Sequence, residues 1–275
     1  MHGVTHSTPG APPTPTGYAY LDDPRRPIAF AHRGGATHPD LVGLENTLTA
    51  FRHAAALGYT YLETDVHATR DGVLLAFHDD VLDRVSDTSG GIVDATYDEI
   101  RQVRIGGREP IPTLAELLDA LPHVRFNIDL KADAAVPLLA RMLEERQAYD
   151  RVLVGSFSLR RLNRFRRLTG GRVPTSATPL EVLAFRFLPS GRLADRLTRG
   201  RVAALQVPHR RGPVTVTTPG LVRRAHRAAK HVHSWTIDDP AEMILLLDRG
   251  VDGLMTDRTD ILKDVLLERG QWTGS

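Results

Sequence analysis

The sequence predicts an α/β protein whose parallel strands close into a (β/α)8, TIM-type barrel. Short β-branched or apolar runs alternate with amphipathic segments from residue 28 to residue 270, which is the pattern of repeated βα units. Eight such runs fit a closed barrel, although the pattern leaves a doubly wound open sheet as an alternative. The strand candidates are residues 28–32, 61–66, 125–130, 152–157, 172–177, 204–208, 232–237 and 253–257.

Helices are predicted between the strands from apolar spacing and from capping signals. Thr113 stands three residues before Glu116, which is the spacing of a capping box at a helix start. Gly58 is a stop signal at the end of another amphipathic segment. The predicted helices are residues 46–58, 113–122, 158–171, 239–250 and 257–270.

Two stretches fall outside the alternation. After the second strand, residues 73–80 resemble an extra strand and residues 86–112 an irregular segment, so we expect a small insertion there. Residues 1–22 are rich in Pro, Thr and Gly and lack the layout of a secretion signal. We expect a flexible tail over 1–22, one barrel domain over 23–275, and the cytoplasm as the default location.

Composition excludes several classes of protein. The chain is 41% hydrophobic and 25% charged, as in ordinary globular proteins, and it has no cysteine for disulfides or thiolate chemistry. No apolar run approaches the roughly 20 residues of a membrane span. Residues 151–230 hold 18 Lys and Arg against 2 Asp and Glu. Because aromatic residues are not interleaved for base stacking, we interpret these charges as solvated helix faces and expect no nucleic-acid partner.

Carboxylates gather at the ends of two predicted strands. Glu63 and Asp65 are two residues apart and therefore project from the same face of their strand. Asp129 and Lys131 end the next strand with the same spacing. A hard divalent cation would relieve the repulsion between such carboxylates, and a set without cysteine favours Mg²⁺ or Ca²⁺ over Zn²⁺. The alternatives are surface acids and a structural Asp–Lys pair.

Two histidines occupy similar strand-end positions. His32 and His78 each follow an apolar run, and imidazoles near a metal could divide acid and base work. His67 shares a face with the carboxylates by spacing and is a weaker candidate. His231 and His233 open their strand at the end opposite the expected active site, so we interpret them as structural.

The stretch IAFAHRGG, residues 28–35, combines these features. Its apolar residues would fill the first barrel strand, with His32 and Arg33 at the mouth. Gly34 and Gly35 would let the backbone turn and leave room for a phosphate to approach.

Six motifs in this order resemble the glycerophosphodiester phosphodiesterase family. The similarity runs from about residue 28 to residue 262. Each motif is weak alone, but their order and spacing together are specific. The motifs are HRGG (32–35), ENT (45–47), ETDVHATRDG (63–72), FHDD (77–80), NIDLK (127–131) and SWTIDD…GVDGLMTD (234–257).

The resemblance implies a TIM-type barrel with an inserted segment and metal-dependent hydrolysis of a glycerophosphodiester to glycerol 3-phosphate and an alcohol. The implied cofactor is a divalent cation, Mg²⁺ or Ca²⁺, with Mn²⁺ as a further option. The implied site residues are His32 and His78 for acid–base catalysis, Glu63, Asp65 and Asp129 for the metal, Arg33, Lys131 and Trp235 for the substrate, and Glu45 and Asn46 in support.

Two positions depart from the family pattern. Leu44 precedes the ENT motif where the family usually has proline, and a longer loop, residues 37–44, leads up to it. Asp129 stands where the family often has glutamate, so one metal ligand is shorter. Neither change removes a chemical group.

A second enzyme class stays open: a phospholipase D or lysophospholipase-type barrel that acts on membrane lipids. Residues 179–201 motivate it, because Leu183 and Phe187 lie beside Arg186 and Arg192, a composition suited to peripheral contact with an anionic membrane. The alternative for this segment is a helix packed on the barrel. A non-catalytic phosphodiester-binding module is disfavoured because no expected ligand or histidine is missing.

Overall fold

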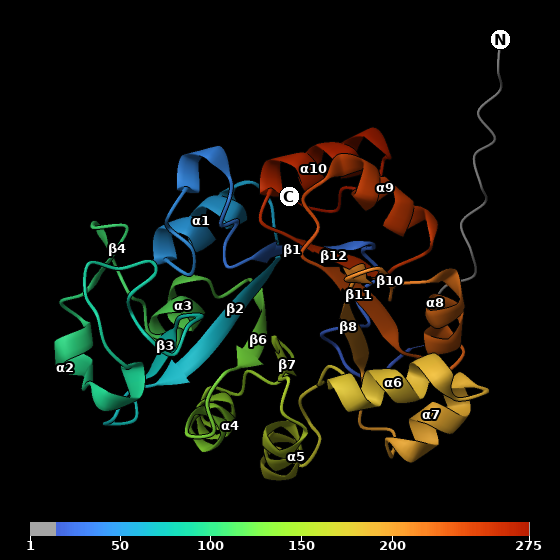
Figure 1. The fold of residues 1–275 in the computed structure, drawn as a ribbon, viewed down its shortest axis with the longest axis horizontal. Helices are drawn as coiled ribbons and strands as arrows, with labels where there is room; N and C mark the ends of the chain where they lie inside the picture. The colour runs from blue at the N-terminus through green and yellow to red at the C-terminus, as the bar shows by residue number, and fades with distance from the viewer. Residues whose placement is uncertain (1–14, 275) are drawn as a thin grey trace.

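The computed structural model describes residues 15–274. Its centre is a curled sheet of parallel strands surrounded by helices (Figure 1), which confirms the predicted barrel architecture. The strands neighbour each other in the order β7–β6–β2–β1–β12–β11–β8. Their bounds are β1 Ile28–His32, β2 Tyr61–Ala68, β6 Arg125–Leu130, β7 Val152–Gly155, β8 Ala204–Pro208, β11 His231–Trp235 and β12 Gly253–Thr256.

The eighth strand position is reduced to two residues. Thr175 forms a parallel bridge with Val154 of β7, and Ser176 forms one with Ala204 of β8. The predicted strand over 172–177 is therefore wrong in extent, although its bridges still join β7 to β8. Pro174 has no N–H to donate to a ladder, and Thr178 already caps the next helix, so little extended chain fits between them.

The predicted helices are present, each shorter by a few residues at its ends. Thr113 and Glu116 form the expected capping box, with the Thr113 N–H donating to Glu116 Oε2 at 2.8 Å. None of the helices in residues 15–274 is long and apolar enough to span a membrane. The main helices are α1 Leu48–Ala56, α3 Leu114–Ala120, α4 Ala135–Glu145, α5 Leu159–Leu168, α6 Pro179–Phe187, α7 Gly191–Leu197, α8 Pro219–His226, α9 Pro240–Asp248 and α10 Thr259–Glu268.

The insertion after β2 is more ordered than its sequence indicates. The short strand β3 Leu74–Ala76 pairs antiparallel with the end of β2, and the elements after it lie beyond β3 in Figure 1. The insertion has a small apolar core of its own, which includes Phe77, Leu82 and Ile92. Its elements are η2 Ile92–Asp94, α2 Tyr97–Ile100, β4 Arg104–Ile105 and β5 Glu109–Pro110, and a further two-stranded hairpin, β9 Arg210–Arg211 and β10 Val214–Thr215, follows β8.

The inside of the barrel is filled by side chains from several strands. Ile28 and Phe30 of β1 point inward and pack with Tyr61, Leu153 and Met255. The alternating Ala31 faces outward, into the larger core between strands and helices. The same inward-facing series continues along each strand, so its last members lie at the carboxyl end, where the barrel opens. In β1 this series runs from Ile28 and Phe30 to His32.

The predicted tail boundary at residue 22 is wrong. Tyr20 and Leu21 are fully buried under the barrel, and the Tyr61 hydroxyl donates to the Tyr20 carbonyl at 2.9 Å. These two apolar side chains cover the lower end of the barrel, so the folded domain begins before residue 23. The rest of the predicted tail, residues 1–14, lies outside the described residues.

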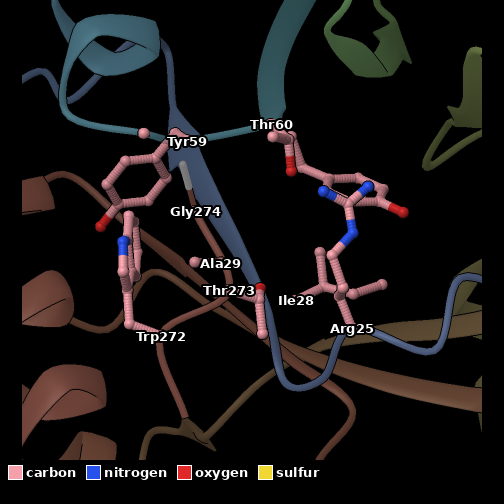
Figure 2. Close-up of a pocket in the computed structure, with 10 residues that line it drawn as sticks. Arg25, Ile28, Ala29, Tyr59, Thr60, Trp272, Thr273 and Gly274 are labelled. Carbon is pink, nitrogen blue, oxygen red and sulfur yellow. The ribbon is translucent and has the colours of Figure 1, made fainter. Parts of the chain in front are cut away.

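A small pocket lies at the same amino-terminal end of the strands (Figure 2). It is lined by Ile28 at the start of β1, by Tyr59 and by the C-terminal Trp272 and Gly274. The Tyr59 and Trp272 rings pack edge to face, with their centroids 5.1 Å apart. The pocket is thus where the end of the chain closes the barrel floor, and it is remote from the strand ends that carry the polar motifs.

His231 and His233 are buried at the start of β11, in agreement with a structural role. The His233 ring packs on Phe30, with a centroid distance of 4.9 Å, and its Nδ1 lies 3.2 Å from Gln206 Nε2. Burial lowers the pKa of His233 to about 3 and that of His231 to about 4. Both imidazoles are therefore neutral in the folded protein over a pH range in which the unfolded chain takes up protons.

We expect the free energy of unfolding to fall as the pH drops from 6.5 towards 4.5. Each depressed histidine contributes stability above its unfolded pKa of about 6.5, and below it the loss is about 1.4 kcal/mol per pH unit per histidine. His233→Gln should reduce this slope, while His123→Gln, at an exposed position, should keep it. Urea titrations at several pH values measure the slope, and an equal slope in His233→Gln and the wild type would contradict the assignment.

Candidate active site

Strand register brings the predicted site residues together at the carboxyl end of the sheet. His32 of β1 pairs with Glu63 of β2, and Asp65 of β2 pairs with Asp129 of β6. Residues paired across neighbouring strands lie about 5 Å apart. Three strands therefore deliver one histidine and three carboxylates to a single edge of the sheet, as the period-2 spacing predicts.

His32 is held by a carboxylate that the sequence analysis does not identify as a site residue. Its Nδ1 lies 2.7 Å from Oδ1 of Asp257, which follows β12, and its Nε2 lies 3.7 Å from Oε2 of Glu63. Burial lowers the pKa of His32, but the Glu63 charge and the Asp257 hydrogen bond outweigh it and raise the pKa above its usual value. The imidazole is thus oriented through Nδ1, and Nε2 is turned towards the buried acid.

His78 has the same arrangement further along β2. Its Nδ1 lies 2.5 Å from Oδ1 of Asp79. The loop that carries it is fixed to β2, because the Phe77 N–H donates to the Asp65 carbonyl at 3.0 Å. The His67 ring reaches the His78 carbonyl at 3.1 Å, so His67 supports the loop that presents His78.

Glu63 and Asp65 are buried like charges on one strand. Burial and the neighbouring Asp65 raise the pKa of Glu63 to about 8. Burial also raises the pKa of Asp65, but Lys131 and Arg33 outweigh it and lower the pKa below its usual value. The Lys131 ammonium lies 3.0 Å from Asp65 and 2.8 Å from Asp129. The site therefore needs positive charge, and the chain supplies part of it.

The three carboxylates fit a hard divalent cation. Glu63, Asp65 and Asp129 offer only oxygen ligands, as Mg²⁺ and Ca²⁺ prefer. The raised pKa of the buried Glu63 is a sign of unbalanced negative charge that a cation would offset. In this structure Lys131 joins Asp65 to Asp129, so the acids do not converge on one point.

Arg33 turns back over the carboxylates through a left-handed backbone. Its φ is +49°, its Nε lies 3.3 Å from Asp65 and its Nη1 donates to Glu45 at 3.1 Å. Asn46, also left-handed with φ +59°, accepts from Thr64 at 2.8 Å and donates to Asp65 at 3.3 Å. Glu45 and Asn46 thus support the site from the segment ahead of α1.

The two glycines after Arg33 make room for helices rather than for a phosphate. A Cβ on Gly34 would lie 2.7 Å from the Cβ of Ala50 in α1, and one on Gly35 would lie 3.0 Å from Thr259 in α10. Their φ values, +85° and +95°, also disfavour other residues. The expectation of a turn is confirmed, whereas the space that these glycines leave is used by the barrel's own packing.

Arg84 connects the insertion to both sides of the site. Its guanidinium contacts both oxygens of Glu45, at 2.7 and 2.8 Å, and its Nε donates to Asp79 at 2.6 Å. Because Glu45 holds Arg33 and Asp79 holds His78, one arginine of the insertion supports two predicted site residues. Arg84 lies in a segment without a periodic pattern, so the sequence alone does not predict its contacts with the site.

An aromatic pair lies at the mouth. Trp235 ends β11 and packs edge to face with Phe157, their centroids 6.0 Å apart. Phe157 follows β7 and is 62% exposed. The sequence prediction placed Phe157 inside a strand, so its position on a mouth loop is a correction. An exposed aromatic next to Trp235 forms an apolar wall beside the polar site.

Comparison with known proteins finds one family that matches most of the chain. The model of the glycerophosphoryl diester phosphodiesterase family matches residues 32–261. The chain is 44% identical over 251 residues to a probable glycerophosphodiester phosphodiesterase 2 of Mycobacterium tuberculosis, covering 90% of this chain and 94% of that protein.

Two solved structures share the fold. A putative glycerophosphoryl diester phosphodiesterase from Silicibacter pomeroyi matches with a TM-score of 0.77 at 23% identity, over 92% of this chain and 99% of that one. An Oleispira antarctica phosphodiesterase in complex with the product sn-glycerol-3-phosphate matches with a TM-score of 0.73 at 23% identity, over 88% and 97%. The matched family model and the M. tuberculosis relative identify this chain as a member of the glycerophosphoryl diester phosphodiesterase family, a family of phosphoric diester hydrolases that act on glycerophosphodiesters.

Proposed function

We propose that this chain hydrolyses glycerophosphodiesters to glycerol 3-phosphate and an alcohol, with His32 and His78 as the acid–base pair. The main support is that an aspartate lies within hydrogen-bond distance of Nδ1 of each histidine. Asp257 lies 2.7 Å from His32, and Asp79 lies 2.5 Å from His78. Such a bond fixes the ring and its tautomer, so Nε2 is the nitrogen available for proton transfer. The Oleispira complex with sn-glycerol-3-phosphate supports the substrate class.

The two histidines divide the proton transfers of the reaction. One Nε2 takes the proton from the attacking hydroxyl, of water or of the glycerol 2-position, as its oxygen bonds to phosphorus. The other gives a proton to the leaving alkoxide as the second P–O bond breaks, because an unprotonated alkoxide is a poor leaving group. When water attacks, glycerol 3-phosphate forms directly, and proton exchange with solvent returns both histidines to their starting states. When the glycerol 2-hydroxyl attacks, a cyclic phosphate forms, and water then opens it with the two histidines in exchanged roles, so either route adds one water in total.

Arg33 and Lys131 are placed to bind the phosphoryl oxygens. Both cations lie within about 3.3 Å of Asp65, so their charges are concentrated at the mouth. Negative charge grows on the phosphoryl oxygens in the transition state, and fixed cations stabilise it. Glu63, Asp65 and Asp129 would hold a divalent cation, Mg²⁺, Ca²⁺ or Mn²⁺, which when bound supplies further charge stabilisation to the same oxygens.

We propose that the apolar wall formed by Trp235 and Phe157 orients the glycerol or alcohol part of the substrate. Trp235 and Phe157 offer apolar faces at the mouth, and a sugar-like or aliphatic group packs well on such faces. A coupled assay for glycerol 3-phosphate across choline, ethanolamine, glycerol and inositol head groups tests the substrate class. Failure to release glycerol 3-phosphate from any of them would contradict the proposal.

Replacing either histidine should reduce turnover without loss of fold. His32→Ala and His78→Ala should each lower kcat by about 10²–10⁴-fold, because general acid–base catalysis contributes that much. His123→Ala, at an exposed position away from the mouth, is the matched control. Circular dichroism checks the fold of all three, and near wild-type kcat in His32→Ala or His78→Ala would remove that residue from the mechanism.

Removing divalent cations should abolish activity reversibly. After EDTA treatment and desalting, kcat should fall to background and return on addition of Mg²⁺, Ca²⁺ or Mn²⁺, because the repulsion between buried carboxylates needs a cation. Asp65→Asn should weaken the metal response, which is measured as the cation concentration for half-maximal activity. Full activity in metal-free enzyme would show that Arg33 and Lys131 suffice on their own.

A second candidate function is action on lipid substrates at a membrane surface. Helices α6 and α7 lie side by side (Figure 1), and they leave Leu180, Leu183, Phe187 and Leu197 between 49% and 72% exposed. Phe185 of the same segment is fully buried, so the segment packs on the barrel and still presents an apolar face. Exposed apolar residues beside arginines suit an anionic bilayer.

Vesicle binding separates the two candidates. Wild-type protein should co-sediment with anionic vesicles if the lipid function holds, and Leu180→Ser/Phe187→Ser should reduce the bound fraction several-fold. Val93→Ser, which removes an exposed apolar side chain from the insertion, is the control and should bind as the wild type does. Absence of wild-type binding at low salt would leave the water-soluble glycerophosphodiesters as the substrates.

A further inference from the structure

We propose that His38, Asp40 and His53 form a second metal site, for a borderline transition metal such as Zn²⁺, that fastens the loop after β1 to helix α1. One ligand atom from each of these side chains lies within 4.8 Å of the other two. The group shares no residue with the carboxylates at the barrel mouth, and the proposal does not rest on the phosphodiesterase function.

The distances in this group are a few tenths of an ångström longer than those between ligands of one ion. Oδ2 of Asp40 lies 3.9 Å from Nδ1 of His38 and 3.8 Å from Nε2 of His53. The centroids of the two imidazole rings are 4.4 Å apart. These gaps are too long for hydrogen bonds. Two ligands on a tetrahedral ion, with bonds of about 2.0–2.2 Å, stand roughly 3.3–3.6 Å apart. Small rotations of the side chains would bring the three onto one ion.

Backbone hydrogen bonds and a helix cap fix the chain at two of the three ligands. The His38 N–H donates to the Gly35 carbonyl at 3.0 Å, and its own carbonyl accepts from Leu41 at 2.9 Å at the start of η1 Pro39–Leu41. His53 lies within α1, whose first turn Thr47 caps. Asp40 is 75% exposed and free to rotate. Its N–H makes a long bond of 3.2 Å to Nδ1 of His38, which an ion at that nitrogen would replace.

The ligand types select a different metal from that of the barrel mouth. Two imidazoles with one carboxylate favour Zn²⁺, Co²⁺ or Ni²⁺, whereas the all-oxygen set Glu63, Asp65 and Asp129 favours Mg²⁺ or Ca²⁺. An imidazole coordinates such an ion through a neutral ring nitrogen. Water would complete the coordination. Such an ion would brace the loop that runs from Arg33 to Glu45.

Zinc titration of the full chain tests this site. All proteins carry His2→Ala/His6→Ala, which removes the histidines of the N-terminal segment, and excess Mg²⁺ is present to occupy the carboxylates. Isothermal calorimetry should give one Zn²⁺ per chain. His53→Gln and Asp40→Asn should each weaken Zn²⁺ binding by at least about 10-fold, since each removes a ligand. His123→Gln should bind Zn²⁺ as the background protein does.

Two further measurements keep the outcome clear. Co²⁺ in place of Zn²⁺ should give visible absorption bands that disappear in Asp40→Asn, an exposed change that does not threaten the fold. Glycerol 3-phosphate release is assayed with Mg²⁺ in the same proteins, so failure of the zinc site is distinguished from failure of the phosphodiesterase. The proposal would be overturned if the background protein bound no Zn²⁺. It would also be overturned if His53→Gln and Asp40→Asn bound Zn²⁺ as tightly as the background protein does.

Discussion

The site is organised around two buried carboxylates that share one strand face. Glu63 and Asp65 are 5% and 2% exposed, and a buried charge is stable only when it is paired. The surrounding structure supplies the pairing charges: Lys131 after β6 and Arg33 after β1 both approach Asp65, and the His32 ring approaches Glu63. The same positive groups are the ones a phosphodiester needs. The electrostatic demand of the fold and the chemistry of the reaction thus coincide.

This arrangement depends on strand register. A shift of one residue in the pairing of β2 would turn Glu63 and Asp65 out of the barrel and bring apolar neighbours into the mouth. The register is fixed from below, where Phe30, Tyr61 and Met255 fill the barrel and Tyr20 closes it. The apolar core therefore contributes to function by setting which polar atoms meet at the upper end.

Local periodicity explains how much of the site the sequence predicts. Glu63 and Asp65 are two residues apart in β2, so their shared face follows from geometry alone. Asp129 joins them through the register of β2 with β6. Asp257 stands at a strand end too, but nothing local indicates that β12 and β1 are neighbours. That contact forms across 225 residues. The acid–base roles of His32 and His78 are implied by the family resemblance, because spacing alone does not assign them.

Two other differences between the predicted and the observed fold have different causes. The strand at 172–177 shrinks to two bridged residues because Pro174 and the cap at Thr178 limit it. Tyr20 joins the core although its neighbours in the chain have the composition of a tail. For Tyr20 the tertiary context outweighs local composition, whereas the strand is limited by features local to its own sequence.

The insertion carries His78 and also controls the site through Arg84, a residue for which no catalytic role is proposed. Through Arg84 it holds Glu45 and Asp79 together, and these acids in turn hold Arg33 and His78. A displacement of the insertion would release an anion-binding group and a proton-transfer group at once. The insertion's separate apolar core keeps Arg84 in place without help from the barrel interior. Sequence change in its loops can therefore reshape the mouth while the barrel strands and their carboxylates stay fixed.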